Sequence, residues 1–372
     1  MSLKNLKIAI VCDWLTNFGG AEKVILALHQ LFPKAPIYTS IYNPAAMPGF
    51  ENAIIHTSYL QNLPWAKNKH QLYLNFMPQV FEKFDLNGYD IVISSSHSCA
   101  KGIITKPKTL HICYCHSPMR YAWENSHKYV KQYEINSSIK KIAPFFLHKI
   151  RMWDRLSADR VDYFLANSKH IQNRIHKYYR RTSSVIYPYV DSKKFKVSTE
   201  KKGYFLAVGR LTPYKRFDLI VDAFNELGLP LKIVGKGISF KKLSERANHN
   251  IEFLGHVSEE TLCELYSKAR GLIFPQVEDF GITPLEAMAS GCPVIAFKAG
   301  GALETIIDKK TGLFFEEQNV TSLKAVIQKF NHMQFDSKVI REQAEKFDRS
   351  IFNEKLIEFI EKKWENWQKE MV

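Results

Sequence analysis

Two glutamates eight positions apart, Glu278 and Glu286, flank a short segment that contains Gly281. Glu278 follows the apolar run 271–275, which predicts a buried strand, and Glu286 lies in the helical pattern behind it. In an open α/β sheet, ligands bind beyond the carboxyl ends of the strands. Gly281 allows the backbone to approach a ligand closely, and free N–H groups at a helix start can hold an anion. Those N–H groups belong to Phe280, Gly281, Ile282 and Thr283. The pattern is suited to a sugar joined to a diphosphate.

Two cations follow another predicted strand, which spans 204–208. Gly209 and Arg210 end the strand, and a turn then leads to Lys215 immediately before a helical pattern. This order places both cations at the carboxyl end of the strand, on the same edge of the sheet as the glutamates. A diphosphate leaving group gains negative charge as the glycosidic bond breaks, and two fixed cations stabilise that charge.

Two further motifs lie in the first half of the chain. Gly19 and Gly20 come between the predicted strand 7–12 and a helical pattern, where paired glycines let backbone N–H groups approach a phosphate. The motif is neither a P-loop nor a complete dinucleotide fingerprint. His116 ends the predicted strand 110–115, a position that is somewhat more typical of a structural or capping residue than of a catalytic one.

The string from Phe274 to Ala296 resembles the donor-sugar signature of retaining glycosyltransferases of family 4, which have the GT-B architecture. The resemblance extends over nearly the whole chain and is strongest over 203–307. It implies that Arg210 and Lys215 bind the diphosphate and that Gly19 and Gly20 face the donor diphosphate and the acceptor. It further implies that Glu286 accepts hydrogen bonds from the ribose hydroxyls. Glu278 then approaches the transferred sugar, and His116 hydrogen-bonds a hydroxyl close to the reacting carbon.

The length of 372 residues suits two domains, and short apolar runs alternate with amphipathic stretches throughout. This alternation predicts an α/β protein with two Rossmann-like, doubly wound domains facing across a cleft. We expect a first, acceptor-side domain over 1–186 and a donor domain over 187–351. The terminal run 352–372 is amphipathic, and by resemblance it forms a helix that packs back on the first domain.

The sequence predicts no bound metal and no cofactor other than the nucleotide-sugar substrate. No Asp-x-Asp motif occurs, and Cys113, Cys115 and His116 have no second ligand cluster nearby in the sequence. The resemblance implies that the acceptor attacks the sugar on the face from which the leaving group departs, so no enzymic nucleophile is required.

Positive charge is concentrated in the first half of the chain. Residues 1–200 contain 27 Lys and Arg against 13 Asp and Glu, whereas residues 201–372 contain 25 against 24. A basic half implies an anionic partner. Without a recognisable nucleic-acid module, we expect an anionic membrane surface rather than nucleic acid. No window is apolar enough to span a membrane, and no secretory segment opens the chain. A cytoplasmic protein, peripheral at the inner face of the membrane, is therefore expected.

We expect a retaining glycosyltransferase that moves a hexose from a nucleotide diphosphate sugar to a lipid-linked or growing glycan acceptor. The strings 18–24 and 116–124 look like those of bacterial mannosyltransferases of surface polysaccharide assembly, which implies GDP-mannose as the donor. Three alternatives stay open: a UDP-hexose donor, an inactive nucleotide-sugar-binding partner subunit, and a basic polyanion binder.

Overall fold

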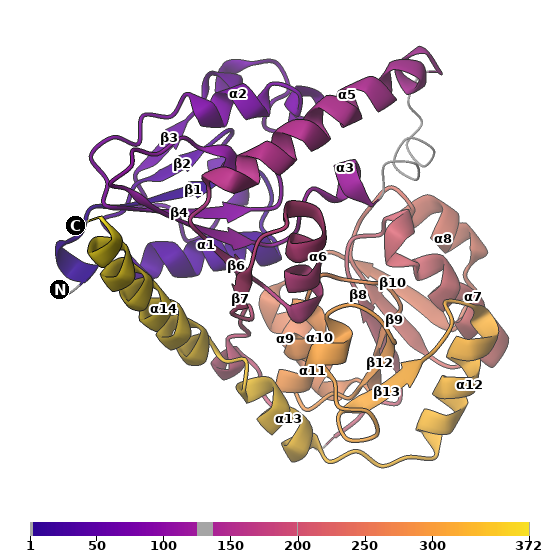
Figure 1. Cartoon of the computed structure of the whole chain (residues 1–372). Helices are drawn as coiled ribbons and strands as arrows, with labels where there is room; N and C mark the ends of the chain where they lie inside the picture. The colour runs from indigo at the N-terminus through magenta and orange to yellow at the C-terminus, as the bar shows by residue number, and fades with distance from the viewer. Residues whose placement is uncertain (1–2, 125–136, 199, 372) are drawn as a thin grey trace. The chain divides into compact units, whose positions relative to one another are not determined.

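The computed structural model describes residues 3–124, 137–198 and 200–371. The chain divides into two compact units. Unit 1 consists of Met1–Tyr187 and Asn353–Val372, and unit 2 consists of Pro188–Phe352. Each unit contains one sheet of parallel strands with helices packed around it (Figure 1).

The sheet of unit 1 has seven strands in the order β3-β2-β1-β4-β5-β6-β7. All of its neighbouring strands pair in parallel. The strands are β1 (Ile8–Cys12), β2 (Ile37–Thr39), β3 (Ile55–Thr57), β4 (Ile91–Ser96), β5 (Leu110–Cys115), β6 (Tyr163–Ala166) and β7 (Ser183–Val185). The main helices are α1 (Gly20–Leu31), α2 (Met77–Glu82), α3 (Arg120–Trp123), α5 (Ser137–Ser157) and α6 (Lys169–Tyr179).

The sheet of unit 2 has six strands in the order β10-β9-β8-β11-β12-β13, again parallel throughout. The strands are β8 (Phe205–Val208), β9 (Leu231–Val234), β10 (Ile251–Gly255), β11 (Gly271–Phe274), β12 (Val294–Phe297) and β13 (Gly312–Phe315). The helices are α7 (Phe217–Leu227), α8 (Phe240–Arg246), α9 (Glu259–Lys268), α10 (Ile282–Ala289), α11 (Ala302–Thr305), α12 (Val320–Asn331) and α13 (Ser337–Glu345).

The central strands form because their sequences are apolar without interruption. Strands β1, β5 and β11 are buried along their whole length, as expected when helices cover both faces of a parallel sheet. Ten apolar runs predict strands, and all ten strands are present. The runs are 7–12, 37–40, 91–94, 110–115, 163–166, 204–208, 231–234, 251–254, 271–274 and 293–296. The sequence did not predict β3, β7 and β13, which lie at edges of the sheets, and β7 reads Ser-Ser-Val with little apolar content.

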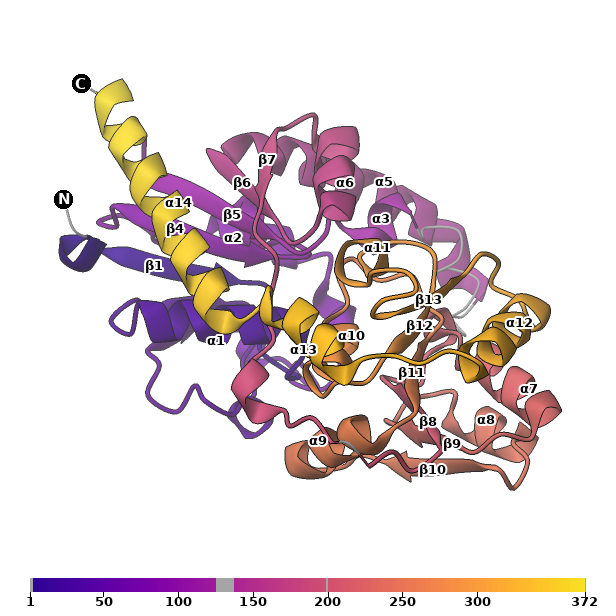
Figure 2. The ribbon, with the colours of Figure 1, turned by 90° about the horizontal axis from the view of Figure 1, so that it is seen from below.

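The last helix, α14 (Arg349–Glu370), packs on unit 1 along an apolar stripe (Figure 2). Leu356, Ile360 and Trp364 recur at helical spacing and are buried. The ammonium of Lys363 lies 4.1 Å from the centre of the Tyr163 ring, next to this stripe. The prediction of an α/β protein with two doubly wound sheets and a returning terminal helix is confirmed. No helix in the described ranges is both long and apolar enough to cross a bilayer.

A buried ion pair fixes helix α5 to unit 1. The ammonium of Lys101 binds the carboxylate of Asp154, and both side chains are almost completely buried. The other carboxylate oxygen accepts hydrogen bonds from Trp123 Nε1 at 2.6 Å and from the Tyr179 hydroxyl at 2.9 Å. Asp154 therefore connects α5 with α3, with α6 and with the segment that follows β4.

Candidate functional site

Both sheets have a point at which the strand order reverses, and there the chain leaves neighbouring strands in opposite directions. In unit 2 this point lies between β8 and β11. Loops at such a point diverge and leave room for a ligand beyond the carboxyl ends of the strands. Arg210 and Lys215 follow β8, and Glu278 follows β11. Three of the residues predicted to bind the donor therefore emerge at one switch point.

Lys215 and Glu278 form an ion pair across this point. Their side chains retain only 15% and 19% of their solvent exposure. Tyr214 lies between the two cations, because its ring centre is 5.6 Å from the ammonium of Lys215 and its hydroxyl is 3.4 Å from Arg210 Nη2. Arg210 itself is exposed to solvent. The structure thus presents one partly buried and one exposed cation beside a carboxylate.

Glycines allow the loops at this edge to lie directly against one another. A Cβ atom on Gly235 would collide with the carbonyl oxygen of Gly209, and one on Gly237 would collide with that of Leu211. Gly209 N donates to Val234 O at 3.0 Å, and Leu211 N donates to Lys236 O at 2.9 Å. The loop that carries Arg210 is therefore held against the loop after β9 by backbone contacts.

Helix α10 begins beside Glu278, and its N-cap residue, Gly281, has no side chain with which to cap the helix. Gly281 precedes the helix with φ of 91°, a conformation that strongly favours glycine. The first N–H groups of a helix have no acceptor within the helix, so this end is suited to an anion. The predicted group of Phe280, Gly281, Ile282 and Thr283 forms this turn.

A second pair of glycines supports the same loop. Gly300 and Gly301 follow β12, and Gly301 N donates to Glu278 O at 2.9 Å. A Cβ atom on Gly300 would strike the carbonyl oxygen of Glu278, and one on Gly301 would strike the backbone of Phe280. These glycines set the position of the backbone that carries Glu278.

Glu286 lies one turn into α10 and receives a hydrogen bond from helix α9. The Tyr266 hydroxyl donates to Glu286 Oε2 at 3.2 Å. Tyr266 is completely buried, and burial together with the nearby Glu286 carboxylate raises its pKa well above the usual value. Tyr266 therefore stays protonated and holds the carboxylate in a fixed orientation.

The switch point of unit 1 lies between β1 and β4, and Asp13 occupies it. The buried carboxylate accepts hydrogen bonds from three backbone N–H groups of the loop after β4, at 2.7 to 2.9 Å, from His97, Ser98 and Ala100. The same carboxylate lies 3.2 Å from His97 Nδ1. Asp13 thus shapes the loop after β4 and orients the His97 ring.

His116 follows β5 at this edge of the sheet and is almost completely buried. Its Nε2 atom lies 2.7 Å from the Ser95 hydroxyl, and its carbonyl accepts from Asn167 Nδ2 at 3.0 Å. Burial, and secondarily the nearby His97, lowers the pKa of His116 to about 3. The ring is therefore neutral at physiological pH and is suited to hydrogen bonding rather than to charge stabilisation.

Gly19 and Gly20 begin helix α1 as predicted. The N–H of Gly19 donates to Glu22 Oε2 at 2.9 Å, so a carboxylate already occupies this position. A phosphate at this helix start would compete with Glu22. The role of the two glycines toward a diphosphate stays a prediction. The described residues contain no group of three His, Cys, Asp or Glu side chains arranged to hold a metal ion.

Sequence reasoning missed several residues of the two switch points. Asp13, His97 and Tyr266 act through contacts with distant segments, which spacing alone does not reveal. The glycines after β9 and β12 carried a signal, because a Gly-x-Gly or a Gly-Gly pair directly after a predicted strand indicates close backbone contact. These are Gly235, Gly237, Gly300 and Gly301.

Comparisons with known proteins agree with the fold and with both motif regions. Residues 18–194 match the family model of Glycosyltransferase Family 4, and residues 190–347 match the model of Glycosyl transferases group 1. An uncharacterized glycosyltransferase of Methanocaldococcus jannaschii is 28% identical over 58% of this chain and 63% of its own length. The O-antigen chain mannosyltransferase RfbU of Salmonella typhimurium is 30% identical over 52% of this chain and 63% of its own length. The chain thus matches less than two thirds of either relative.

A solved structure of Anabaena HepE in complex with UDP has the same fold. It superimposes with a TM-score of 0.72 at 18% identity, covering 96% of this chain and 100% of that one. Taken with the two family models, which together extend from residue 18 to residue 347, the fold and the motifs show that this chain belongs to the group 1 glycosyltransferases of the family 4 type.

Proposed function

We propose that this protein transfers a hexose from a nucleotide diphosphate sugar and retains the configuration at the anomeric carbon. One observation carries the proposal: Arg210, Lys215 and Glu278 emerge at the switch point of unit 2, beside the start of helix α10. Cations and helix N–H groups bind phosphate oxygens, and a carboxylate binds sugar hydroxyls. This combination is suited to a sugar diphosphate.

The ion pair of Lys215 and Glu278 gives the two residues a shared role. A diphosphate that binds Lys215 would compete with Glu278 for the ammonium. The carboxylate would then turn to the sugar hydroxyls, and Lys215 would stabilise the charge that develops on the leaving diphosphate. Arg210 would add a second cation, and Glu286, held by Tyr266, would accept hydrogen bonds from the ribose.

His116 supplies a neutral imidazole. We propose that it hydrogen-bonds a hydroxyl of the transferred sugar, while Ser95 fixes its ring. A neutral ring can accept or donate a hydrogen bond without placing a positive charge beside the oxocarbenium-like carbon. The reaction needs no side-chain nucleophile if the acceptor attacks on the face from which the diphosphate departs.

GDP-mannose is the donor that we propose first. RfbU, which shares 30% identity over about half of this chain, is named as a mannosyltransferase of the O-antigen chain. We propose accordingly a lipid-linked or growing glycan acceptor in surface polysaccharide assembly, used at the inner face of the membrane. A UDP-hexose is the second candidate, favoured by the UDP bound to HepE.

Transfer assays with purified protein test this function. Incubation with GDP-mannose or UDP-glucose, with undecaprenyl-linked oligosaccharides as acceptors, is followed by mass spectrometry of the lipid fraction. A mass increase of one hexose from either donor supports hexosyl transfer, and the donor that gives it identifies the nucleotide. If neither donor is consumed although the protein binds a nucleotide, the inactive partner subunit becomes the better account.

A further inference from the structure

Unit 1 exposes aromatic rings next to lysines in an arrangement that neither switch point uses. Lys69 lies 5.9 Å from the ring centre of Trp65, Lys83 lies 6.0 Å from that of Tyr59, and Lys149 lies 4.6 Å from that of Phe145. All three rings are exposed, Trp65 at 68%, Phe145 at 58% and Tyr59 at 49%. Single exposed rings are common on protein surfaces, whereas exposed apolar side chains that gather on one face mark an interaction site.

The two segments that carry these pairs lie over one part of unit 1. Residues 59–83 and helix α5 contribute buried side chains to the same hydrophobic core, among them Leu60, Phe81 and Ile150. A hydrogen bond of 2.8 Å from Trp153 Nε1 in α5 to Glu82 Oε1 in α2 joins the two segments directly. We call the exposed side chains of 59–83 and 144–157 the lysine–aromatic surface.

Helix α5 divides sharply into two faces. Ile150, Asp154 and Ser157 point into unit 1 and are buried. The opposite face is apolar and exposed, with side chains at helical spacing. It presents Phe145, Met152 and Leu156 together with Lys149. A helix face that is apolar and yet unburied within its own chain is suited to an external apolar partner.

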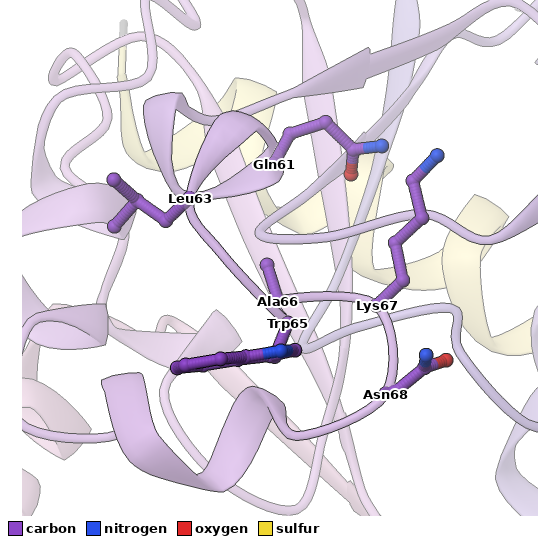
Figure 3. Close-up of a pocket in the computed structure, with 6 residues that line it drawn as sticks. All are labelled: Gln61, Leu63, Trp65, Ala66, Lys67 and Asn68. Carbon is purple, nitrogen blue, oxygen red and sulfur yellow. The ribbon is translucent and has the colours of Figure 1, made fainter.

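The turn at Trp65 combines a strained backbone with an exposed ring. Trp65 has φ of 56°, which costs a residue other than glycine about 1 to 2 kcal/mol. Trp65 O accepts hydrogen bonds from Asn68 N at 3.0 Å and Lys69 N at 2.7 Å, and these hold the turn. A hollow of about 280 Å³ lies beside the ring. Figure 3 shows Leu63 and Trp65 extending to one side of this hollow, and Gln61 and Lys67 to the other.

The charges of the lysine–aromatic surface are one-sided. Residues 59–83 and 144–157 contain six Lys and Arg against two acidic residues. Both acids are already engaged: Asp154 is buried against Lys101, and Glu82 binds Arg160 and Trp153. Three of the lysines, Lys67, Lys69 and Lys83, are exposed in the segment that carries Trp65. Arg155 pairs with Asp159 at 2.8 Å, so the exposed positive charge next to the aromatic rings comes from the lysines.

We infer that the lysine–aromatic surface binds the headgroup layer of a bilayer that contains anionic lipids. Tryptophan and tyrosine rings are stable at the boundary between headgroups and acyl chains, and nearby ammonium groups bind lipid phosphates. A protein or nucleic-acid partner would meet the same positive charge, but single-stranded nucleic acid calls for a groove and not for a convex helix face. This inference rests on the proposed function, because it names the surface through which the protein would contact the membrane. Nucleotide binding by unit 2 is measured separately from vesicle binding.

Vesicle co-sedimentation tests the inference. Two kinds of vesicle are compared, one of phosphatidylglycerol and phosphatidylcholine in equal parts and one of phosphatidylcholine alone. The triple variant Trp65→Ser, Lys67→Gln, Lys69→Gln should lower the partition coefficient for the anionic vesicles by at least about tenfold, because each lysine near such a surface contributes a severalfold increase. The matched control Ile238→Ser, Lys241→Gln, Lys242→Gln removes the same charge and one exposed apolar side chain from unit 2. It should change partitioning less than about twofold.

Brominated lipids supply a second readout that depends on the ring itself. Trp65→Phe should retain vesicle binding, and it should lose much of the fluorescence quenching that brominated acyl chains cause in the unmodified protein. Equal loss of binding in the unit 2 control would overturn the inference, as would equal binding to neutral and anionic vesicles. The inference of membrane binding is also wrong if the triple variant loses affinity for nucleic acid and keeps its affinity for vesicles. In every variant, unchanged stabilisation by nucleotide shows that unit 2 is intact and keeps this test separate from that of the proposed function.

Discussion

Lys215 and Glu278 form an ion pair although they are 63 positions apart in the chain and follow different strands. The pairing occurs because β8 and β11 are neighbours at the switch point of unit 2. Asp13 and His97 have the same relationship in unit 1, where β1 and β4 are neighbours. In each unit, a pair of ionisable side chains is brought together by the two strands at which the sheet reverses direction.

Replacing Lys215 with alanine should lower catalytic efficiency by about 2 to 4 kcal/mol of transition-state stabilisation, because the leaving diphosphate loses its partly buried cation. The measurement is kcat/KM with the active donor sugar. Lys232→Ala is a suitable control, because it also removes a lysine that forms an ion pair. Lys232 lies on strand β9, and its ammonium is 3.0 Å from the carboxylate of Glu252. Similar losses in both variants would contradict a specific role for Lys215.

Replacing Glu286 with glutamine should weaken nucleotide binding itself, because an amide accepts weaker hydrogen bonds from ribose hydroxyls than a carboxylate does. Tyr266→Phe should weaken it less, by about 1 kcal/mol, because this change removes only the hydroxyl that orients the carboxylate. Titration calorimetry with the nucleoside diphosphate gives both values. Unaltered affinity in the Glu286 variant would exclude the ribose contact.

Gly300→Ala should destabilise the protein more than Gly228→Ala. Both glycines have φ of 65°, so an alanine at either position incurs the same backbone strain of about 1 to 2 kcal/mol. Only Gly300 lies against the carbonyl of Glu278, whereas nothing lies within 4 Å of a Cβ atom on Gly228. The collision should add about 1 to 3 kcal/mol. Denaturant unfolding of the two variants measures the difference, and equal stabilities would show that the Glu278 loop moves aside at little cost.

Most of the fold could be predicted because the central strands are short apolar runs separated by amphipathic helices. Burial of both sheet faces leaves that pattern in the sequence. The edge strand β10 was predicted, but the edge strands β3 and β7 could not be recognised, because each has only three residues and is only partly buried. Ser183 to Val185, for example, becomes a strand only because it pairs with β6. The edge strand β13 was missed although it is apolar and mostly buried.

The donor residues could be named from the sequence, but their contacts could not. Nothing in the spacing of Lys215 and Glu278 indicates that they pair with each other, since the pairing depends on the strand order. The contact between Tyr266 and Glu286 could not be predicted for the same reason, because tertiary packing alone brings helix α9 next to Glu286. Gly19 shows the converse, since its position was predicted and its bond to Glu22 was not.

Replacing Lys101 with methionine should destabilise unit 1 strongly, because it leaves the carboxylate of Asp154 buried without a cation. The expected loss is about 3 to 5 kcal/mol. Adding Asp154→Asn should restore part of this stability, because the amide is neutral and can still accept from Trp123 and Tyr179. Urea denaturation followed by circular dichroism provides the comparison. If the losses in unfolding free energy of the two single variants simply add in the double variant, Lys101 and Asp154 are not coupled.

Stability should fall as the pH drops below about 6.5, the value at which histidines of the unfolded chain take up protons. Burial lowers the pKa of His111 to about 4 in the folded protein. Between these values the unfolded chain binds a proton that the folded chain does not, which costs about 1.4 kcal/mol of stability per pH unit. His111→Gln should therefore reduce the loss between pH 6.5 and pH 5 by about 2 kcal/mol. Unfolding free energies at both pH values test this, and an unchanged loss would show that His111 does not cause it.

Nucleotide binding by unit 2 is the central claim, and thermal unfolding with GDP, UDP, ADP and CMP at equal concentration tests it most directly. A ligand at one hundred times its dissociation constant stabilises a protein by about 2.7 kcal/mol, which raises the melting temperature measurably. We expect one nucleoside diphosphate, GDP first, to raise it in the unmodified protein, and to raise it far less in the Lys215→Ala variant. No increase with any of the four nucleotides, or an equal increase in the variant, would contradict the assignment of this site.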